Sequence, residues 1–414
     1  MQEQSRYAVG IDVGTTTIRC VVGHVDPATG TPTIVGVGQA PNSGMRKGTV
    51  VNLSGPAHAI DQALGDAERM SGHEVNDATI SVNGSHILST KADGMIAVGM
   101  ADHEITAEDL RRLEEVATTG KVPANREILE VVPFSYTLDG QGGVKDPIGM
   151  TGTRLEILAN VVSAMGPYIS NLQKASELAT VAPNAMVPSA MAAAKAVLNE
   201  SQIESGVAVI DMGGATTSVA VFEEGDLQYV GVVPMGGANI TNDLAIGLKT
   251  DPEIAEKVKI QHGVAVARKE NEGVSIKQDN EILTFNTSEI DEIVEARLEE
   301  IFELVNVELK KAGRAGQLPS GVVLVGGTSN LKAIAEFAKE HLGVAARMGK
   351  ATGFGGVADD IDKPQFATAV GLMLIDAESI ATTSTGKNGK HSQAGKGLSN
   401  AGGFLKNILG KFKA

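Results

Sequence analysis

The sequence is poor in aromatic residues: its 414 residues include 9 Phe, 4 Tyr and no Trp. Proteins that bind single-stranded nucleic acids stack successive bases on aromatic side chains. The formal net charge of −15 adds a second argument, because nucleic-acid-binding domains are usually basic. We therefore expect no nucleic acid among the partners of this protein.

The sequence also has few features of secreted or membrane-spanning proteins. Its single cysteine, Cys20, excludes an internal disulfide and is typical of a reducing compartment. No apolar run reaches the ~18 residues that a spanning helix needs. The short polar segment 1–6 does not have the composition of a signal peptide. We expect a cytoplasmic protein in which Cys20 is a small buried thiol.

Two segments in separate halves of the chain carry an Asp-Xaa-Gly sequence at the end of a hydrophobic strand. They read Asp12-Val13-Gly14-Thr15-Thr16 and Asp211-Met212-Gly213-Gly214-Ala215-Thr216. The glycines let backbone N–H groups approach an anion, and the threonines add hydroxyl donors. The aspartates would repel a phosphate, but they can hold the Mg²⁺ that accompanies it, usually through water. One such turn is commonly only structural, whereas two facing each other predict a nucleoside triphosphate site between two domains.

A third motif lies near residue 321, where a buried-type strand ends in Gly326 and Gly327 and is followed by Thr328. The two glycines would allow the backbone to approach a base or phosphate closely. The helix expected after them would add its N-terminal N–H groups.

The sequence pattern predicts an α/β fold in which three successive strands occur twice. The first set is expected at 7–13, 17–23 and 33–38, and the second at 207–212, 216–222 and 227–233. An insert interrupts each half. The expected divisions are 1–77 (first half), 78–162 (inserted α/β domain), 163–202 (first half continued), 203–244 (second half), 245–315 (second insert, charged and helical), 316–365 (second half continued), 366–377 (closing helix), 378–402 (flexible linker) and 403–414 (amphipathic helix).

Several local signals predict where helices begin. Ser54 is expected to cap a helix at about 55–70, and Thr106 one that runs through Ala117. The Ala-rich segment 185–199 is expected to follow the helix at 167–180 and to pack closely.

The composition changes abruptly at Glu378, after which Ser, Thr, Gly, Lys and Asn dominate, as in a flexible linker. On a helical projection the last residues then form an apolar face of Phe404, Leu405, Ile408, Leu409 and Phe412 and a basic face with Lys406, Lys411 and Lys413. Such a helix binds an anionic membrane surface, to which each Lys adds ~1 kcal/mol. The alternative is a helix that docks back on the body of the protein.

The duplicated motifs are similar to those of the superfamily of actin, heat-shock chaperone and sugar kinase ATPases. Within it, nearly the whole sequence resembles the FtsA family of bacterial division proteins. Residues 145–150, Lys-Asp-Pro-Ile-Gly-Met, resemble a segment of the FtsA inserted domain. The resemblance implies an actin-like ATPase fold with two ribonuclease-H-like halves and ATP with Mg²⁺ between them.

The resemblance also implies further site residues. Gly236 and Gly237 would form the start of the phosphate-side helix, and Glu256 and Lys259 would contact the ribose and base. Arg297 matches a basic position that binds the C-terminal peptide of FtsZ. The other interpretation of Arg297 is an exposed helix residue that forms ordinary ion pairs with the glutamates around it.

The implied function is to polymerise at the inner face of the cytoplasmic membrane at the division site and to tether FtsZ filaments there. Later division proteins would bind the 78–162 insert. Any ATPase activity would be slow, and no catalytic residue is identified.

Three other functions occur in the same superfamily and lead to different expectations. A small-molecule kinase would need a catalytic base that the sequence does not offer. A pilus-assembly adaptor of the PilM type would share the fold but not need its own lipid anchor. A chaperone would need a substrate-binding domain that does not follow the core.

Overall fold

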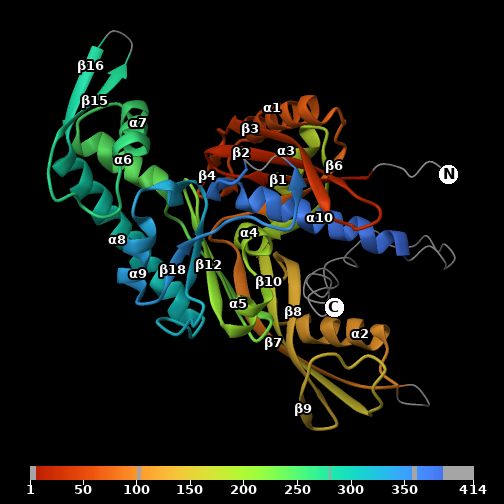
Figure 1. Cartoon of the computed structure of the whole chain (residues 1–414). Coiled ribbons are helices and arrows are strands. Elements are labelled where there is room, and N and C mark those ends of the chain that lie inside the picture. Colours follow the sequence, from red (N-terminus) through yellow and green to blue (C-terminus); the bar gives the residue numbers. More distant parts are fainter. Residues whose placement is uncertain (1–5, 100–103, 279–280, 357–360, 386–414) are drawn as a thin grey trace.

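The computed structural model of the chain describes residues 6–99, 104–278, 281–356 and 361–385 (Figure 1). The first sheet has the strand order β11-β6-β1-β2-β3-β19. Its strands are β1 (Arg6–Val13), β2 (Thr17–Val25), β3 (Pro32–Pro41), β6 (Asp77–Val82), β11 (Ala182–Pro188) and β19 (Gly355–Gly356). Strands β1 to β3 form the expected β-β-β series and pair in antiparallel fashion, and β6 runs parallel to β1.

Helices α1 (Ser54–Ser71) and α10 (Ala367–Thr385) cover opposite faces of this sheet. Gly38 of β3 lies against Ala63 of α1, and Gly10 of β1 lies against Ala369 of α10. A Cβ atom at either glycine would overlap the facing helix backbone, so both helices pack unusually close to the strands.

A single buried carboxylate ties α10 to the first sheet. Asp376 accepts hydrogen bonds from the backbone N–H of Val9 (2.9 Å) and from the hydroxyl of Thr79 (2.8 Å), which lie on two neighbouring strands. The amide of Asn184 on β11 also donates to it, at 3.2 Å. The expected closing helix is therefore present, and it is longer than 366–377.

The second sheet repeats the arrangement of the first, with the order β14-β13-β12-β17-β18. Its strands are β12 (Val207–Met212), β13 (Thr217–Glu223), β14 (Asp226–Val233), β17 (Val322–Val325) and β18 (Ala346–Met348). Strands β12 to β14 are antiparallel and β17 is parallel to β12, as β6 is to β1. The predicted duplication of the β-β-β order is confirmed.

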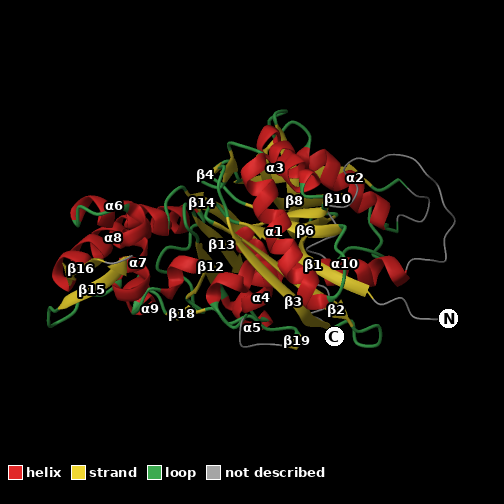
Figure 2. Ribbon diagram, turned by 90° about the horizontal axis from the view of Figure 1, so that it is seen from above, coloured by secondary structure: helices red, strands yellow, loops and turns green. Residues whose placement is uncertain are grey.

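Around these sheets lie helices α3 (Gly166–Leu178), α4 (Ser189–Val197), α5 (Glu200–Ser205), α6 (Gly237–Gly247), α7 (Pro252–His262), α8 (Thr287–Lys311) and α9 (Ile334–Leu342). The elements outside the inserted domain also include two 3-10 turns, η1 (Gly327–Asn330) and η2 (Pro364–Phe366). Two short antiparallel pairs complete them: β4 (Met45–Arg46) with β5 (Thr49–Val50), and β15 (Gly273–Gln278) with β16 (Glu281–Asn286). Figure 2 shows α6, α7 and α8 at the opposite end of the molecule from α2 (Ala107–Thr118), the helix of the inserted domain.

The inserted domain has its own sheet, β7-β10-β8-β9, and its own hydrophobic core. It consists of β7 (Leu88–Ala97), α2 (Ala107–Thr118), β8 (Arg126–Leu138), β9 (Gln141–Val144) and β10 (Arg154–Met165). Thr106 caps α2 as predicted, and it does so in a capping box with Asp109. Lys145 joins this domain to the second half, because its Nζ lies 2.6 Å from Asp226 Oδ2.

Four sequence expectations need correction. Residues 78–82 lie in β6 of the first sheet, so the insert begins after Val82 rather than at 78. Ser54 does not cap α1; its N–H and hydroxyl donate to Asn52 Oδ1 instead, at 2.9 and 2.6 Å. In the Ala-rich segment the helix starts only at Ser189, because the preceding residues pair with β6. The second insert is not entirely helical, because it contains the β15–β16 hairpin.

Candidate functional site

The two Asp-Xaa-Gly turns meet between the two halves of the protein. A Cβ atom built on Gly214 would lie only 2.6 Å from Thr16 Oγ1, so the second turn touches the first. The first turn is held by Asn42, whose amide donates to the Gly14 carbonyl at 2.7 Å. Thr15 Oγ1 accepts the Gly48 N–H at 3.1 Å. The second turn is closed by a hydrogen bond from Gly213 N–H to Thr216 O at 2.8 Å.

The two aspartates of these turns are poorly solvated carboxylates. Asp211 is only 8% exposed, and it accepts a hydrogen bond from Thr368 Oγ1 at 3.2 Å. Burial, together with the negative charge of Asp12, raises the pKa of Asp211 to about 7. Burial also raises the pKa of Asp12, although the charge of Arg19 and a hydrogen bond from Ser81 partly oppose this effect. Two like charges held in this way favour a cation between them.

Arg19 is a site residue that the sequence analysis missed. It lies on β2 directly opposite Asp12 in the strand register, and its positive charge acts on both Asp12 and Asp211. Its guanidinium carbon is 5.6 Å from the ring centre of Phe366. Its Nε is buried, and among the described residues nothing accepts a hydrogen bond from it. A buried donor without an acceptor is costly, so Arg19 is suited to an anionic ligand.

The third motif and the start of α6 converge on the second turn. The N–H groups of Gly237 and Ala238 donate to the carbonyls of Gly213 and Gly214, at 3.0 and 2.6 Å. Thr328 Oγ1 also donates to Gly213 O, at 2.8 Å. Gly213 therefore sits where the second turn, α6 and the third motif join.

The glycines of this region are needed first for packing within the protein. A Cβ atom at Gly236 would lie 2.5 Å from Gly213 O, and one at Gly326 would lie 2.5 Å from Asp211 Oδ1. Gly326 also has φ +87°, which few other residues adopt. Gly327, by contrast, has no atom within 4 Å of its Cβ position among the described residues. The expected helix does not follow these glycines directly, because η1 comes first and α9 begins only at Ile334.

Lys259 and Glu256 form a compact polar cluster between α7 and α6. Lys259 Nζ donates to Glu256 Oε2 (2.6 Å), to Thr241 Oγ1 (2.8 Å) and to the Gly237 carbonyl (3.1 Å). Thr241 also donates to Glu256. The predicted ribose- and base-side residues thus contact the same helix start that supports the second turn.

Arg297 is already paired within the protein, and its partners lie on two helices, α6 and α8. Its Nε and Nη2 donate to the two carboxylate oxygens of Asp243 on α6, at 2.5 and 3.1 Å. It also pairs with Glu300 on α8. The hydrogen bonds that Arg297 donates to Asp243 are the main reason why the pKa of Arg297 is raised further. A peptide carboxylate would have to compete with Asp243 for this side chain.

Some sequence-based predictions lie outside the described residues. They comprise most of the linker at 378–402 and all of the amphipathic segment 403–414, with Phe404, Leu405, Lys406, Ile408, Leu409, Lys411, Phe412 and Lys413. Among the described residues, no helix has both the length and the apolar composition to cross a bilayer.

Two family models match the chain. The model described as "Cell division protein FtsA" matches residues 208–371, and that of the "SHS2 domain inserted in FTSA" matches residues 84–163. The second match begins just after β6, in agreement with the corrected start of the insert.

Curated relatives match along most of their length. The chain is 33% identical to the cell division protein FtsA of Pseudomonas aeruginosa, with 90% of this chain and 89% of that protein covered. It is 36% identical to FtsA of Bacillus subtilis, with 88% and 82% covered. Identity to FtsA of Escherichia coli K12 is 30%, with 90% and 91% covered.

Solved structures share the fold at low sequence identity. A chain of the PilM-PilN type IV pilus biogenesis complex superposes with a TM-score of 0.66 at 16% identity, covering 89% of this chain and 98% of that one. MreB5 of Spiroplasma citri bound to ADP gives a TM-score of 0.52 at 13% identity, covering 93% and 99%. The actin-like ATPase fold expected from the sequence is confirmed.

Proposed function

Because the chain belongs to the FtsA family of cell division proteins, we propose that it binds ATP and Mg²⁺ between its two halves, assembles into actin-like filaments and tethers FtsZ polymers to the membrane. The observation that carries the nucleotide site is the meeting of the two Asp-Xaa-Gly turns at Thr16 and Gly214. The membrane and FtsZ functions rest on the sequence of the tail and on family membership.

The phosphates would lie between the two turns. Thr15, Thr16 and Thr216 offer hydroxyl groups, and the turns themselves offer backbone N–H groups. Arg19 would contribute the positive charge that the turns lack, and its buried Nε has no acceptor among the described residues. The donor set fits a polyphosphate because it combines oriented N–H groups with one guanidinium.

Asp12 and Asp211 would hold Mg²⁺, which neutralises phosphate charge when it is bound. Mg²⁺ is usually bound by one or two carboxylates and takes its other ligands from phosphate and water, so a pair of aspartates beside a polyphosphate fits it. The raised pKa of Asp211 supports this role, since a nearby cation would favour its ionised form.

The nucleoside would lie toward α6 and α7, where Glu256 and Lys259 form their cluster with Thr241. Gly236, Gly237, Gly326, Gly327 and Thr328 surround the second turn on this side. Gly327 is the glycine with open space at its Cβ position, and it would allow close approach of the base.

FtsZ would bind through its C-terminal peptide to the second insert, where Arg297 lies on α8. An acidic peptide residue would replace Asp243 or Glu300 as its partner. The 84–163 domain would bind later division proteins. The amphipathic segment 403–414 would attach the filament to anionic lipid at the inner face of the membrane, weakly for one copy and firmly for a polymer.

A sedimentation experiment tests the tether. The full chain with ATP and Mg²⁺ is mixed with FtsZ and with vesicles that contain phosphatidylglycerol, and a variant that ends at residue 402 serves as the control. We expect FtsZ to sediment with the vesicles only when the full chain is present. Lipid binding without FtsZ in the pellet would contradict the proposed partner and would favour an adaptor of the PilM type.

A further inference from the structure

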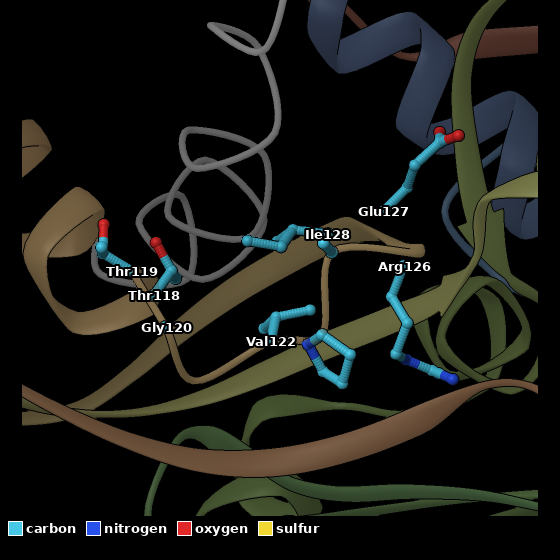
Figure 3. Close-up of a pocket in the computed structure, with 9 residues that line it drawn as sticks. Thr118, Thr119, Gly120, Val122, Arg126, Glu127 and Ile128 are labelled. Atoms are coloured by element: carbon cyan, nitrogen blue, oxygen red, sulfur yellow. The ribbon is translucent and has the colours of Figure 1, made fainter.

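The inserted domain carries a pocket of about 560 Å³ between the end of α2 and the start of β8 (Figure 3). Its apolar lining comes from Val122, Pro123, Ala124 and Ile128, and its polar lining includes Thr118, Arg126 and Glu127. Sites that bind drug-sized ligands commonly have a volume of ~300–1,000 Å³. The residues that line this pocket all belong to the inserted domain, and none of them belongs to the two Asp-Xaa-Gly turns.

The pocket reaches the hydrophobic core of the inserted domain. Val122 and Ile128 are partly buried and pack against that core. Val116, on the last turns of α2, is 47% exposed. Val116, Val122 and Ile128 therefore form an apolar floor of the pocket region, against which bulky apolar side chains could pack.

The exposed charged side chain among those that line the pocket is that of Glu127, whereas Arg126, which also lines it, is half-buried and donates to Ser163 and to the His86 carbonyl. Glu115 is exposed one turn before Thr119 at the end of α2, and Lys121 nearby is paired with Asp93. The two arginines of α2 are paired with Glu108 and Asp109 in the first half of the helix. A basic amphipathic segment would match both the apolar floor and this charge.

The chain itself contains such a segment at 404–414, whose apolar face carries two Phe, two Leu and one Ile beside three Lys. It follows 18 residues after α10 ends at Thr385. A flexible chain of this length has a root-mean-square span of roughly 25 Å, which gives an effective concentration on the order of millimolar. Both views of the molecule show the C-terminal end of α10 on the same side as α2 (Figures 1 and 2).

We propose that residues 404–414 dock in the pocket at 118–128 of the same chain when no membrane is present. The apolar face of the segment cannot contact the pocket and the lipid at the same time. Docking therefore lowers the apparent affinity for membranes by the fraction of molecules that are undocked. Each copy must release residues 404–414 from the pocket before it can bind lipid. A single copy would therefore bind the membrane weakly, whereas a polymer with many copies would still bind it firmly.

The first test uses Ala124→Arg in the full chain and vesicles that contain phosphatidylglycerol. Ala124 is exposed in a loop, so the substitution fills the pocket and repels the lysines without disturbing the core. Asn125→Arg adds the same charge at the next exposed position, which does not line the pocket. We expect Ala124→Arg to bind vesicles about five- to tenfold more tightly than Asn125→Arg. Equal affinity of the two variants would overturn the proposal.

The second test needs neither lipid nor nucleotide, so it can fail or succeed independently of the proposed tether. Hydrogen exchange of the full chain is compared with that of a variant ending at residue 402. We expect backbone amides of 118–128 to exchange at least threefold faster in the shortened variant. No difference between the chains would overturn the docking. Protection that grows with protein concentration would also overturn it, because a second copy would then be the occupant.

Discussion

Thr16 and Gly214 contact each other across the two halves of the protein, and a side chain on Gly214 would overlap Thr16. Gly214→Val should force the two turns apart and weaken ATP binding at least tenfold, about 1.4 kcal/mol. Gly65→Ala, on α1, is a suitable control because its Cβ would meet only the flexible end of Arg69, at 3.5 Å. Titration calorimetry with Mg-ATP measures both. Unchanged affinity in Gly214→Val would show that the nucleotide does not bind between these turns.

Asp211 should make the protein less stable as the pH rises. Its pKa is about 7 in the folded protein and near 3.8 when unfolded, so the folded state binds the extra proton between these values. The resulting stability is fully present below pH 3.8 and is lost as the pH rises through about 7. Asp211→Asn removes the cost of ionising this buried carboxyl. At pH 8 without Mg²⁺ the substitution should therefore raise the free energy of unfolding by up to ~4 kcal/mol.

Urea denaturation of both proteins at several pH values measures the effect. The difference between Asp211→Asn and the unchanged protein should increase from pH 5 to pH 8. A difference that does not depend on pH would contradict the raised pKa of Asp211.

Asp243 should restrain Arg297 in the absence of FtsZ. Asp243→Asn weakens the paired hydrogen bonds on Arg297, so the FtsZ C-terminal peptide should bind severalfold more tightly, whereas Arg297→Ala should weaken it. Glu303→Gln makes the same charge change at an exposed position of α8. Fluorescence anisotropy of a labelled peptide compares the three variants. If Asp243→Asn and Glu303→Gln bind the peptide with equal affinity, Asp243 does not restrain Arg297 and the prediction is wrong.

Asp376 should be among the more important polar residues for stability. Asp376→Ala leaves the N–H of Val9 and the hydroxyl of Thr79 without their acceptor in a buried region, and it should cost on the order of 3 kcal/mol. Asp66→Ala is a matched control, because the Asp66 carboxylate pairs with Arg69 on the exposed surface of α1. The urea midpoint reports the result. A loss no larger than that of Asp66→Ala would contradict the role of Asp376 in holding α10 to the sheet.

Much of the fold could be predicted because its signals are local and occur twice. The Asp-Xaa-Gly turns, the strands on either side of them and the Thr106 cap are each specified by a few adjacent residues. The β15–β16 hairpin was missed because its alternation is short: Val274 and Ile276 are buried on either side of exposed Ser275, within a charged segment.

The remaining features depend on contacts between distant parts of the chain. The sequence of residues 78–82 is compatible with a strand of the first sheet and with a strand of the inserted domain. Their pairing with β1 and β11 places them in the first sheet. Arg19 becomes part of the site because strand register puts it opposite Asp12 and because the second half brings Asp211 near it. The pair between Arg297 and Asp243 joins α8 to α6 across 54 residues of sequence.

The central claim is that Asp12 and Asp211 belong to one site for Mg²⁺ and nucleotide. Titration calorimetry of ATP binding, with and without Mg²⁺, tests it in the unchanged protein and in Asp211→Ala. We expect Mg²⁺ to strengthen ATP binding to the unchanged protein, and Asp211→Ala to lose at least tenfold in affinity and most of the dependence on Mg²⁺. Equal affinity and equal Mg²⁺ dependence in the two proteins would contradict the claim.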